Sequence, residues 1–326
     1  MTAGDWKPAA GRRVLELRAR MRARIRAFFE ATGALEVDTP ALSAAAPTDP
    51  HLHALTTRSA ARGDATLYLQ SSPEFPMKRL LAAGVGDCWQ LCRVFRDGER
   101  GRHHNPEFDL LEWYRVGADH HELMDDVEAL VAAAVAPEAV ARGAERLSYA
   151  EAFRRHAGVD PFDADTETLQ ALAAQAHLEP VAGLATEDRQ GLLDRLLAGA
   201  IAPAFPRDRL TFVHDWPAEQ AALARLEPTD PRVARRFEAY WGPMELANGF
   251  HELVDAAEQR ARFEADRAWR RRHGAAEPPV DERLLAALEH GLPDCAGVAL
   301  GFDRLVMVAA GAAHIDEVLA FPVERA

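Results

Sequence analysis

Hydrophobic residues recur at steps of three and four in several parts of the chain, which is the spacing of helices with one buried face. The first such stretch begins near Arg12 and contains Val14, Met21 and Phe28, and Gly33 is well placed to end it. The same spacing predicts further helices over residues 74–84, 119–134, 255–273 and 303–310. We therefore expect a substantial helical layer.

Shorter apolar stretches predict strands over residues 35–40, 67–71, 89–96, 108–116, 210–214, 243–246, 250–254 and 296–300. The polar loop after Arg96 contains Gly98 and Gly101, so its flanking strands should form a long antiparallel hairpin. Asn248-Gly249 likewise predicts a tight turn between two short strands. Strands joined by hairpins, with helices grouped between them, indicate an α+β fold with a mostly antiparallel sheet.

The chain has 326 residues and is 48% hydrophobic, enough for one large domain or two smaller ones. From about residue 137 to 207 the composition shifts to Ala, Leu and charged residues, with a helix-capping box at Ser148 and Glu151. No chemical motif occurs in this segment. We expect one domain over residues 1–326, with a structural helical insertion at about 137–207.

Charge and cysteine content narrow the functional classes. Lys plus Arg number 38 against 51 for Asp plus Glu, so the net charge of −13 matches a nucleic acid poorly. The three cysteines, Cys88, Cys92 and Cys295, suggest reduced thiols in a cytoplasmic protein. No run of 18 apolar residues is present, and the first residues lack a signal-peptide layout, so we expect no membrane span.

The predicted hairpin carries groups suited to a nucleotide. Arg96 lies at the end of a strand, where its planar guanidinium is rigidly aimed and can grip a phosphate from two sides. Glu99 lies in the loop, and Asn105 and Phe108 open the return strand. By themselves these residues also fit a polar hairpin tip with surface ion pairs.

Two carboxylates flank the predicted turn at Asn248. If Glu245 and Glu252 lie on neighbouring strands, the turn brings together hard oxygen ligands that suit Mg²⁺ shared with phosphate oxygens. A hairpin with alternating charges would show the same pattern. Further on, Gly301 would allow close approach to a flat ring, and Arg304 could stack on a base or reach a phosphate.

Ser72, Glu74 and Tyr114 could recognise the amino groups of a substrate, since they combine a hydroxyl, a carboxylate and a phenol. The alternative is a turn beside a half-buried aromatic side chain.

Taken in order, these motifs resemble the catalytic domains of class II aminoacyl-tRNA synthetases of the lysyl type, from about residue 12 to 325. Thr39-Pro40 is similar to the dimer-interface motif, and Phe95-Arg96 through Phe108 to the hairpin that grips ATP. Gly301-Phe-Asp-Arg304 is similar to the closing motif. Glu245-Leu-Ala-Asn-Gly-Phe-His-Glu252 resembles the more specific lysyl-type signature.

The catalytic-type helix begins by about Arg12, which leaves no room for the anticodon-reading OB-fold of a lysyl-tRNA synthetase. A stand-alone domain of this kind resembles the ligases that attach (R)-β-lysine to a lysine of elongation factor P. The resemblance implies ATP and Mg²⁺ as cofactors, a homodimer, and no use of tRNA. Ala299 stands where synthetases usually have glycine, and its methyl could change which diamino acid fits.

The resemblance also implies a role for each matching residue. Arg96, Glu252 and Arg304 would be catalytic, and Glu245 and Glu252 would hold magnesium. The expected ATP-binding residues are Arg96, Asp97, Gly98, Glu99, Asn105, Phe108, Glu245, Leu246, Gly301 and Arg304. The expected β-lysine-binding residues are Ser72, Glu74, Tyr114, Asn248, Glu252 and Ala299.

One position departs from the family. The usual acid two residues after the hairpin arginine is replaced by Gly98, with Glu99 next, so either Glu99 takes that role or the contact is lost. Two other functions remain open: an α-lysine ligase with a different acceptor, and a non-catalytic synthetase paralogue that binds ligands.

Overall fold

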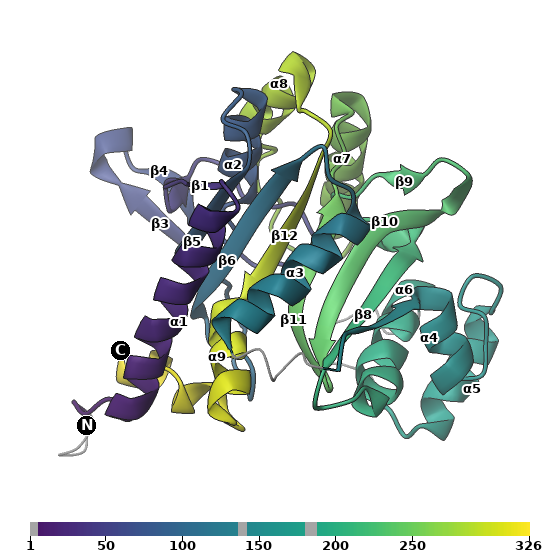
Figure 1. The fold of residues 1–326 in the computed structure, drawn as a ribbon. Helices are drawn as coiled ribbons and strands as arrows, with labels where there is room; N and C mark the ends of the chain where they lie inside the picture. Colours follow the sequence, from purple (N-terminus) through teal and green to yellow (C-terminus); the bar gives the residue numbers. More distant parts are fainter. Residues whose placement is uncertain (1–5, 136–141, 180–187) are drawn as a thin grey trace. The chain divides into compact units, whose positions relative to one another are not determined.

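The structure, a computed structural model, describes residues 6–135, 142–179 and 188–326 (Figure 1). The chain divides into two compact units. The first comprises residues 1–118, 133–135 and 252–326, and the second comprises residues 119–132 and 136–251. Each unit has its own strands, helices and buried core, and each is described by itself.

The sheet of the first unit contains the predicted hairpin. Its strands follow the order β1 (Leu35–Glu36), β5 (Cys88–Phe95), β6 (Glu107–Val116) and β12 (Cys295–Gly301). β1 is parallel to β5, whereas β5–β6 and β6–β12 are antiparallel. A separate three-stranded sheet has the order β2 (Leu42–Ser43), β4 (Ala65–Leu69) and β3 (Thr56–Ser59).

The helices of this unit are α1 (Arg12–Ala31), α2 (Glu74–Ala82), α7 (Ala256–Arg272), α8 (Glu282–Gly291) and α9 (Phe302–Ala310). The predicted stripe of α1 is buried at Met21, Ile25 and Phe29. The ring of Phe29 stacks on Trp89 of β5 with centroids 4.7 Å apart, so α1 packs on the sheet (Figure 1).

The sheet of the second unit has the order β11 (Met244–His251), β10 (Asp230–Trp241), β8 (Leu210–Pro217) and β7 (Glu145–Ser148), and the short β9 (Leu226–Glu227) also pairs with β10. β7 and β8 are parallel, whereas β8–β10 and β10–β11 are antiparallel. Across both units antiparallel pairs predominate, which confirms the predicted α+β class.

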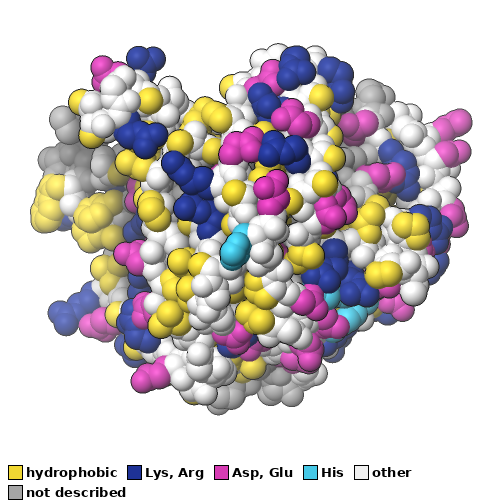
Figure 2. Space-filling view, turned by 90° about the horizontal axis from the view of Figure 1, so that it is seen from above, with side chains coloured by type: hydrophobic (Ala, Val, Ile, Leu, Met, Phe, Trp, Pro, Cys, Tyr) yellow, Lys and Arg dark blue, Asp and Glu magenta, His cyan; other side chains and the backbone are white. Residues whose placement is uncertain are grey.

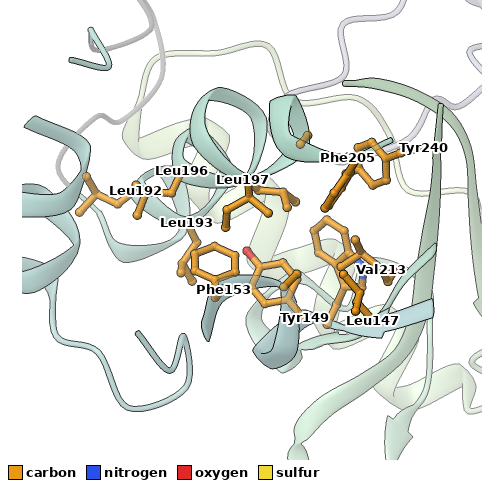
Figure 3. Close-up of a cluster of buried hydrophobic side chains, with 14 of the residues drawn as sticks. Leu147, Tyr149, Phe153, Leu192, Leu193, Leu196, Leu197, Phe205, Val213 and Tyr240 are labelled. Atoms are coloured by element: carbon orange, nitrogen blue, oxygen red, sulfur yellow. Dashed lines mark hydrogen bonds between the residues drawn. The ribbon is translucent and has the colours of Figure 1, made fainter. Parts of the chain in front are cut away.

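Helix α3 (His120–Ala134) begins in the second unit, which also contains α4 (Tyr149–His156), α5 (Thr166–Gln175) and α6 (Arg189–Leu196). Figure 3 shows the core that these last three helices share with β7, β8 and β10, centred on rings such as Tyr149 and Phe153. Ser148 and Glu151 form the predicted capping box. Parts of the expected insertion, residues 137–141 and 180–187, lie outside the described residues, and the single-domain arrangement stays a prediction.

The turn predicted at Asn248-Gly249 is wrong. β11 runs through both residues, with Asn248 opposite Glu238 and Gly249 opposite Phe237 of β10. Asn-Gly forms a tight turn only where the chain must fold back. Here β11 pairs with β10 along almost the whole length of β11, so the two residues stay extended.

The apolar pattern missed β10 and α8. In β10 a register shift interrupts the pairing with β8 between Ala234 and Phe237, and the adjacent Arg235 and Arg236 break the alternation that identifies a strand.

In the described part of the chain, no helix has both the length and the apolar character required to cross a bilayer.

Candidate active site

Three carboxylates of the first unit form a group that we call the carboxylate cluster: Glu74, Glu112 and Glu252. Glu112 lies on β6 and is 2% exposed. The hydroxyl of Ser72 donates to its Oε2 at 2.6 Å, and the hydroxyl of Tyr114 donates to its Oε1 at 2.7 Å. Glu112 and Tyr114 are two residues apart on one strand and therefore share a face of the sheet.

Lys78 connects the other two acids. Its side chain is 1% exposed, and Nζ lies 2.6 Å from Oε1 of Glu74 and 2.6 Å from Oε2 of Glu252. Glu74 and Lys78 are one turn apart on α2, a spacing that places side chains together. The N–H of Glu252 donates to the carbonyl of Cys295 at 3.0 Å, which fixes this acid beside β12.

Burial of more acids than cations shifts the pKa values in this cluster. Burial, reinforced by the charge of Glu74, raises the pKa of Glu112 to about 7. Burial also raises the pKa of Glu252 to about 8, although Lys78 opposes the shift. For Lys78 itself, burial would lower the pKa, but Glu252 and Glu74 outweigh it and raise the pKa. The cluster therefore has fewer positive charges than carboxyl groups.

Gly297 lets the strands approach closely at this point. It pairs with Tyr114 across β12 and β6. A Cβ at this position would lie 2.2 Å from Cε1 of Tyr114 and 2.5 Å from Oε1 of Glu252. Because atoms cannot approach so closely, only glycine fits without movement of both side chains.

The structure thus brings together four predicted substrate-binding residues: Ser72, Glu74, Tyr114 and Glu252. Ala299, a fifth, is half-buried and pairs with Glu112 across β12 and β6. The sequence analysis missed three members of the group: Lys78, Glu112 and Gly297. The spacing of Glu112 from Tyr114 and of Lys78 from Glu74 could have revealed two of them.

The predicted ATP-binding residues of the hairpin gather around Arg96. Its guanidinium carbon lies 5.1 Å from the ring centroid of Phe108, and its NH1 lies 3.6 Å from Oε1 of Glu99. Its Nε donates to the carbonyl of Ser71 at 3.4 Å. The arginine is aimed from a strand end and remains a quarter exposed, which suits it to a phosphate.

The conformation of the hairpin loop explains why the acid expected two residues after Arg96 is absent. Gly98 has φ +77, a left-handed conformation in which any side chain would be strained. The neighbouring Asp97 accepts a hydrogen bond from the Gly98 N–H at 2.9 Å, and its own N–H donates to the carbonyl of His53 at 2.8 Å. The acid that faces Arg96 is instead Glu99, one residue later.

Arg304 lies in the first turn of α9 and reaches the same hairpin. Its Nε donates to the carbonyl of His103 at 3.2 Å, and NH2 lies 2.7 Å from Nε2 of His104. Burial, followed by the charge of Arg304, lowers the pKa of His103 to about 4, so this imidazole is neutral at pH 7. A Cβ at Gly301 would lie nearest to the Arg304 side chain, at 3.5 Å.

Asn105 is 3% exposed and its side chain is used within the protein. Its Nδ2 donates to the carbonyl of Glu107 at 2.7 Å, and its Oδ1 accepts from the N–H of Val323 at 3.1 Å. Asn105 therefore braces the return strand, whatever it contributes to ATP binding.

Asp303, next to Arg304, is buried and anchors α9. Its Oδ2 accepts from the N–H of Asp109 on β6 at 2.8 Å, and its Oδ1 pairs with Arg18 of α1. The same Arg18 contacts the side chain of Asp109 at 2.7 Å. These contacts fix the position from which Arg304 extends.

The remaining predicted residues, Glu245, Leu246 and Asn248, lie on β11 in the second unit. Leu246 is buried. Oδ1 of Asn248 accepts from Nε of Arg236 at 3.2 Å. Burial and then the charge of Glu245 raise the pKa of Glu238 to about 7, so Glu245 has an acidic neighbour on β10.

The donors predicted for magnesium are hard carboxylate oxygens, which fit this ion chemically. Glu245 is half-buried beside Glu238, an arrangement of acids that a dication would stabilise. Glu252 differs, because one of its oxygens already contacts the Lys78 ammonium. The residues therefore fit magnesium better at Glu245 than at Glu252.

Comparison with known proteins gives a consistent result. The sequence model of the family described as tRNA synthetases class II (D, K and N) matches residues 5–325. A Vibrio cholerae protein named elongation factor P–(R)-β-lysine ligase is 51% identical, over 100% of both chains. Proteins of the same name from Klebsiella pneumoniae strain 342 and Yersinia enterocolitica are 50% and 49% identical, each over at least 98% of both chains. The chain belongs to the class II tRNA synthetase family of the D, K and N type.

Proposed function

We propose that this protein is an ATP-dependent ligase that activates (R)-β-lysine as its adenylate and transfers it to the ε-amine of a lysine on elongation factor P. The names of its relatives support this choice of substrate and acceptor. The observation that carries the proposal is the carboxylate cluster, where the buried Glu112 and Glu252 and the half-buried Glu74 are accompanied by a single lysine.

A diamino acid carries two ammonium groups, which need anionic partners when they leave water. Glu74, Glu112 and Glu252 provide more negative charge than Lys78 can neutralise. The hydroxyls of Ser72 and Tyr114 hold Glu112 in place, so the acid is oriented before the ligand arrives. Preorganised carboxylates favour a ligand with two cationic groups over an ordinary amino acid.

In the first step, a carboxylate oxygen of the amino acid attacks the α-phosphorus of ATP, and pyrophosphate leaves. The chain's part is to position the reactants and to offset charge developing on the phosphate oxygens. We assign this role to Arg96 and Arg304, two cationic groups that contact the same hairpin. Magnesium, held by Glu245, would neutralise further phosphate charge when bound.

In the second step, the neutral ε-amine of the acceptor lysine attacks the carbonyl carbon of the adenylate. An amide bond forms, AMP leaves and the amine proton passes to solvent. Only the neutral amine has a lone pair available for attack. The adenylate must be held with its carbonyl carbon within reach of that amine.

We also propose a homodimer through the surface near Pro40. Leu35 and Leu42 flank this residue and are 55% and 48% exposed, and contact with a second copy would cover both. The three cysteines are free, and burial raises the pKa of Cys88 and of Cys92 to about 12, so these thiols are unreactive. The free state of the cysteines supports a reducing, cytoplasmic location.

We propose a protein acceptor rather than tRNA. The net charge is −13, and on the face drawn in Figure 2 basic and acidic side chains lie interspersed rather than gathered by sign. A surface of this kind offers little to a polyanion.

The test is ATP–pyrophosphate exchange with (R)-β-lysine and with L-α-lysine, followed by transfer of labelled β-lysine to elongation factor P. Arg304→Ala should abolish exchange without unfolding the protein, whereas Arg283→Ala, an exposed arginine on α8, should leave it intact. Preference for α-lysine would instead identify a different lysine ligase, and Ala299→Gly would show whether that methyl sets the choice. No exchange with either isomer would refute the proposal.

A further inference from the structure

A second group of ionisable side chains lies in the second unit and has no part in the proposed reaction. We call it the histidine cluster: His120, His121, His214 and Asp215. The first two residues begin α3, and the other two lie on β8. One ligand atom from each of His120, His121 and Asp215 falls within 4.8 Å of the others. That spacing is small enough for a single ion to contact all three.

Asp215 reaches the histidines because β8 and β10 form a bulge at this residue. His214 pairs with Phe237 and Trp216 pairs with Ala234, so Asp215 alone faces Arg235 and Arg236. Its φ is +60, a left-handed conformation that aspartate and asparagine tolerate better than most residues. Bulges of this kind re-aim a side chain, and this one directs a carboxylate at α3.

The contact between His120 and Asp215 has the spacing of two ligands on one ion. Nε2 of His120 lies 3.3 Å from Oδ1 of Asp215. A charge-assisted hydrogen bond is shorter, about 2.7–2.9 Å. Two ligands of a tetrahedral zinc ion with bonds of about 2.0–2.1 Å are separated by about 3.4 Å.

His120 also has hydrogen-bonding capacity that the protein does not use. The side chain is 4% exposed, and among the described residues its Nδ1 has no hydrogen-bond partner. A buried polar group without a partner destabilises the folded chain. An ion bound by Nε2 would leave Nδ1 as the protonated nitrogen of this imidazole, so Nε2 is the nitrogen that is available as a ligand toward Asp215.

The surrounding residues leave the carboxylate free to act as a ligand. Nδ1 of His214 lies 2.9 Å from Oδ2 of Asp215, so this imidazole can orient the carboxylate while Oδ1 faces His120. Such hydrogen bonds to a ligating group are the usual support of a metal site. The arginines across the bulge are held elsewhere: Nε of Arg235 contacts Glu227 at 2.9 Å, and Arg236 lies over the ring of Trp216 at 4.0 Å.

The remaining ligand and the local charge are also favourable. The His121 ring lies 4.1 Å from the His120 ring, measured between centroids, and is more exposed, which gives an ion a route in from solvent. Asp119 accepts hydrogen bonds from the N–H groups of His121 and Glu122, at 2.8 and 2.9 Å. Its charge offsets the positive end of the α3 dipole, which would otherwise disfavour a cation.

We propose that His120, His121 and Asp215 bind one divalent transition-metal ion, for which Zn²⁺ is the first choice. Two imidazoles and a carboxylate are an established zinc ligand set, and Mg²⁺ and Ca²⁺ prefer oxygen ligands alone. The ion would fasten the start of α3 to the β8 bulge, so its role is to stabilise the second unit.

The test uses the full-length protein after metal removal, titrated with Zn²⁺ by calorimetry and analysed for bound metal, with Mg²⁺ present throughout. We expect one tightly bound Zn²⁺ per chain and a melting temperature that rises on binding. Asp215→Asn and His121→Ala should each weaken binding at least tenfold. His290→Ala, an exposed histidine on α8, serves as the matched control and should bind as the wild type does.

Asp215→Asn keeps the side-chain shape and tolerates the left-handed backbone, so it should fold, and circular dichroism checks this. Co²⁺ provides a second readout, because a tetrahedral nitrogen and oxygen site gives visible absorption that the two ligand variants should lose. The proposal is overturned if the wild type binds no Zn²⁺, or if Asp215→Asn binds it as tightly. Neither result depends on whether the protein forms an adenylate.

Discussion

The carboxylate cluster of the first unit and the histidine cluster of the second both contain a buried ionisable side chain, but their charge balances are opposite. In the first, three carboxylates share one lysine, and burial raises the pKa of Glu112 and of Glu252. In the second, one carboxylate contacts two imidazoles. There, burial would raise the pKa of Asp215, but hydrogen bonds from His120 and His214 outweigh it and hold the pKa low.

The difference shows how similar residues are suited to different ligands. Surplus buried carboxylate is destabilised until a cation arrives, so the first cluster suits an organic ammonium that brings its own charge. Imidazole nitrogens beside one carboxylate suit a metal ion, which binds through their lone pairs. The two clusters should therefore respond differently to mutation and to pH.

The largest expected effect comes from removing one acid of the carboxylate cluster. Glu112→Gln keeps the size of the side chain but removes a buried charge that Ser72 and Tyr114 hold in place. Loss of one partner of a buried charged pair costs several kcal/mol, so we expect the KM for the diamino acid to rise about a hundredfold. ATP–pyrophosphate exchange over a range of amino-acid concentrations measures it.

Glu107→Gln is the matched control, because Glu107 lies on the same strand but is exposed. It should change the KM less than twofold, and Zn²⁺ binding should be the same in both variants. A Glu112→Gln enzyme with unchanged KM would mean that this acid is structural and that the comparison between the clusters fails.

A smaller effect is expected from closing the space between the strands. Gly297→Ala places a Cβ within 2.5 Å of both Tyr114 and Glu252, so the side chains must move. Overpacking of this kind costs about 1–3 kcal/mol, and we expect a lower free energy of unfolding together with weaker amino-acid binding. Urea denaturation and the exchange assay measure the two.

Gly301→Ala provides the contrast on the same strand, because its Cβ would lie no closer than 3.5 Å to its nearest neighbour, the Arg304 side chain. Its free energy of unfolding should stay within about 0.5 kcal/mol of the wild type. Equal destabilisation by the two substitutions would contradict the assignment of Gly297 as the close-approach residue.

The sequence could predict elements whose patterns are local. The stripe of α1, the capping box at Ser148 and the antiparallel hairpin from Cys88 to Val116 each depend on neighbouring residues, and all three are present. The turn at Asn248-Gly249 failed because its outcome depends on a partner strand far away in the sequence. β10 was missed for a related reason, because the bulge that interrupts its alternation can be recognised only from its pairing with β8.

The candidate site shows the same division. Motifs indicated Ser72, Glu74, Tyr114 and Glu252, which the structure brings together, but no motif indicated that Lys78 joins two of the acids. The histidine cluster could not be predicted at all. His120 and Asp215 are 95 residues apart, and the left-handed backbone that aims Asp215 leaves no sequence signature.

The smallest expected effect is a dependence of amino-acid affinity on pH. Without ligand, Glu112 and Glu252 have pKa values of about 7 and 8, so both are largely protonated at pH 6. An ammonium ligand favours their ionised forms, and its binding should release protons. Affinity should therefore rise about tenfold from pH 6 to pH 8. Calorimetry in buffers with different ionisation enthalpies would count the protons released.

The sign of the effect distinguishes this cluster from the histidine cluster. A carboxyl group whose pKa is raised by folding holds a proton that the unfolded chain has lost. The contribution of Glu112 and Glu252 to folding stability is therefore fully present below about pH 4.5 and lost as pH rises through about 7 and 8. Asp215, with its lowered pKa, contributes above its unfolded pKa and loses that contribution only in acid.

Glu112→Gln should flatten the pH profile of amino-acid affinity between pH 6 and pH 8, and Asp215→Asn should leave this profile unchanged. If both variants keep the wild-type profile, the titrating groups lie outside the carboxylate cluster.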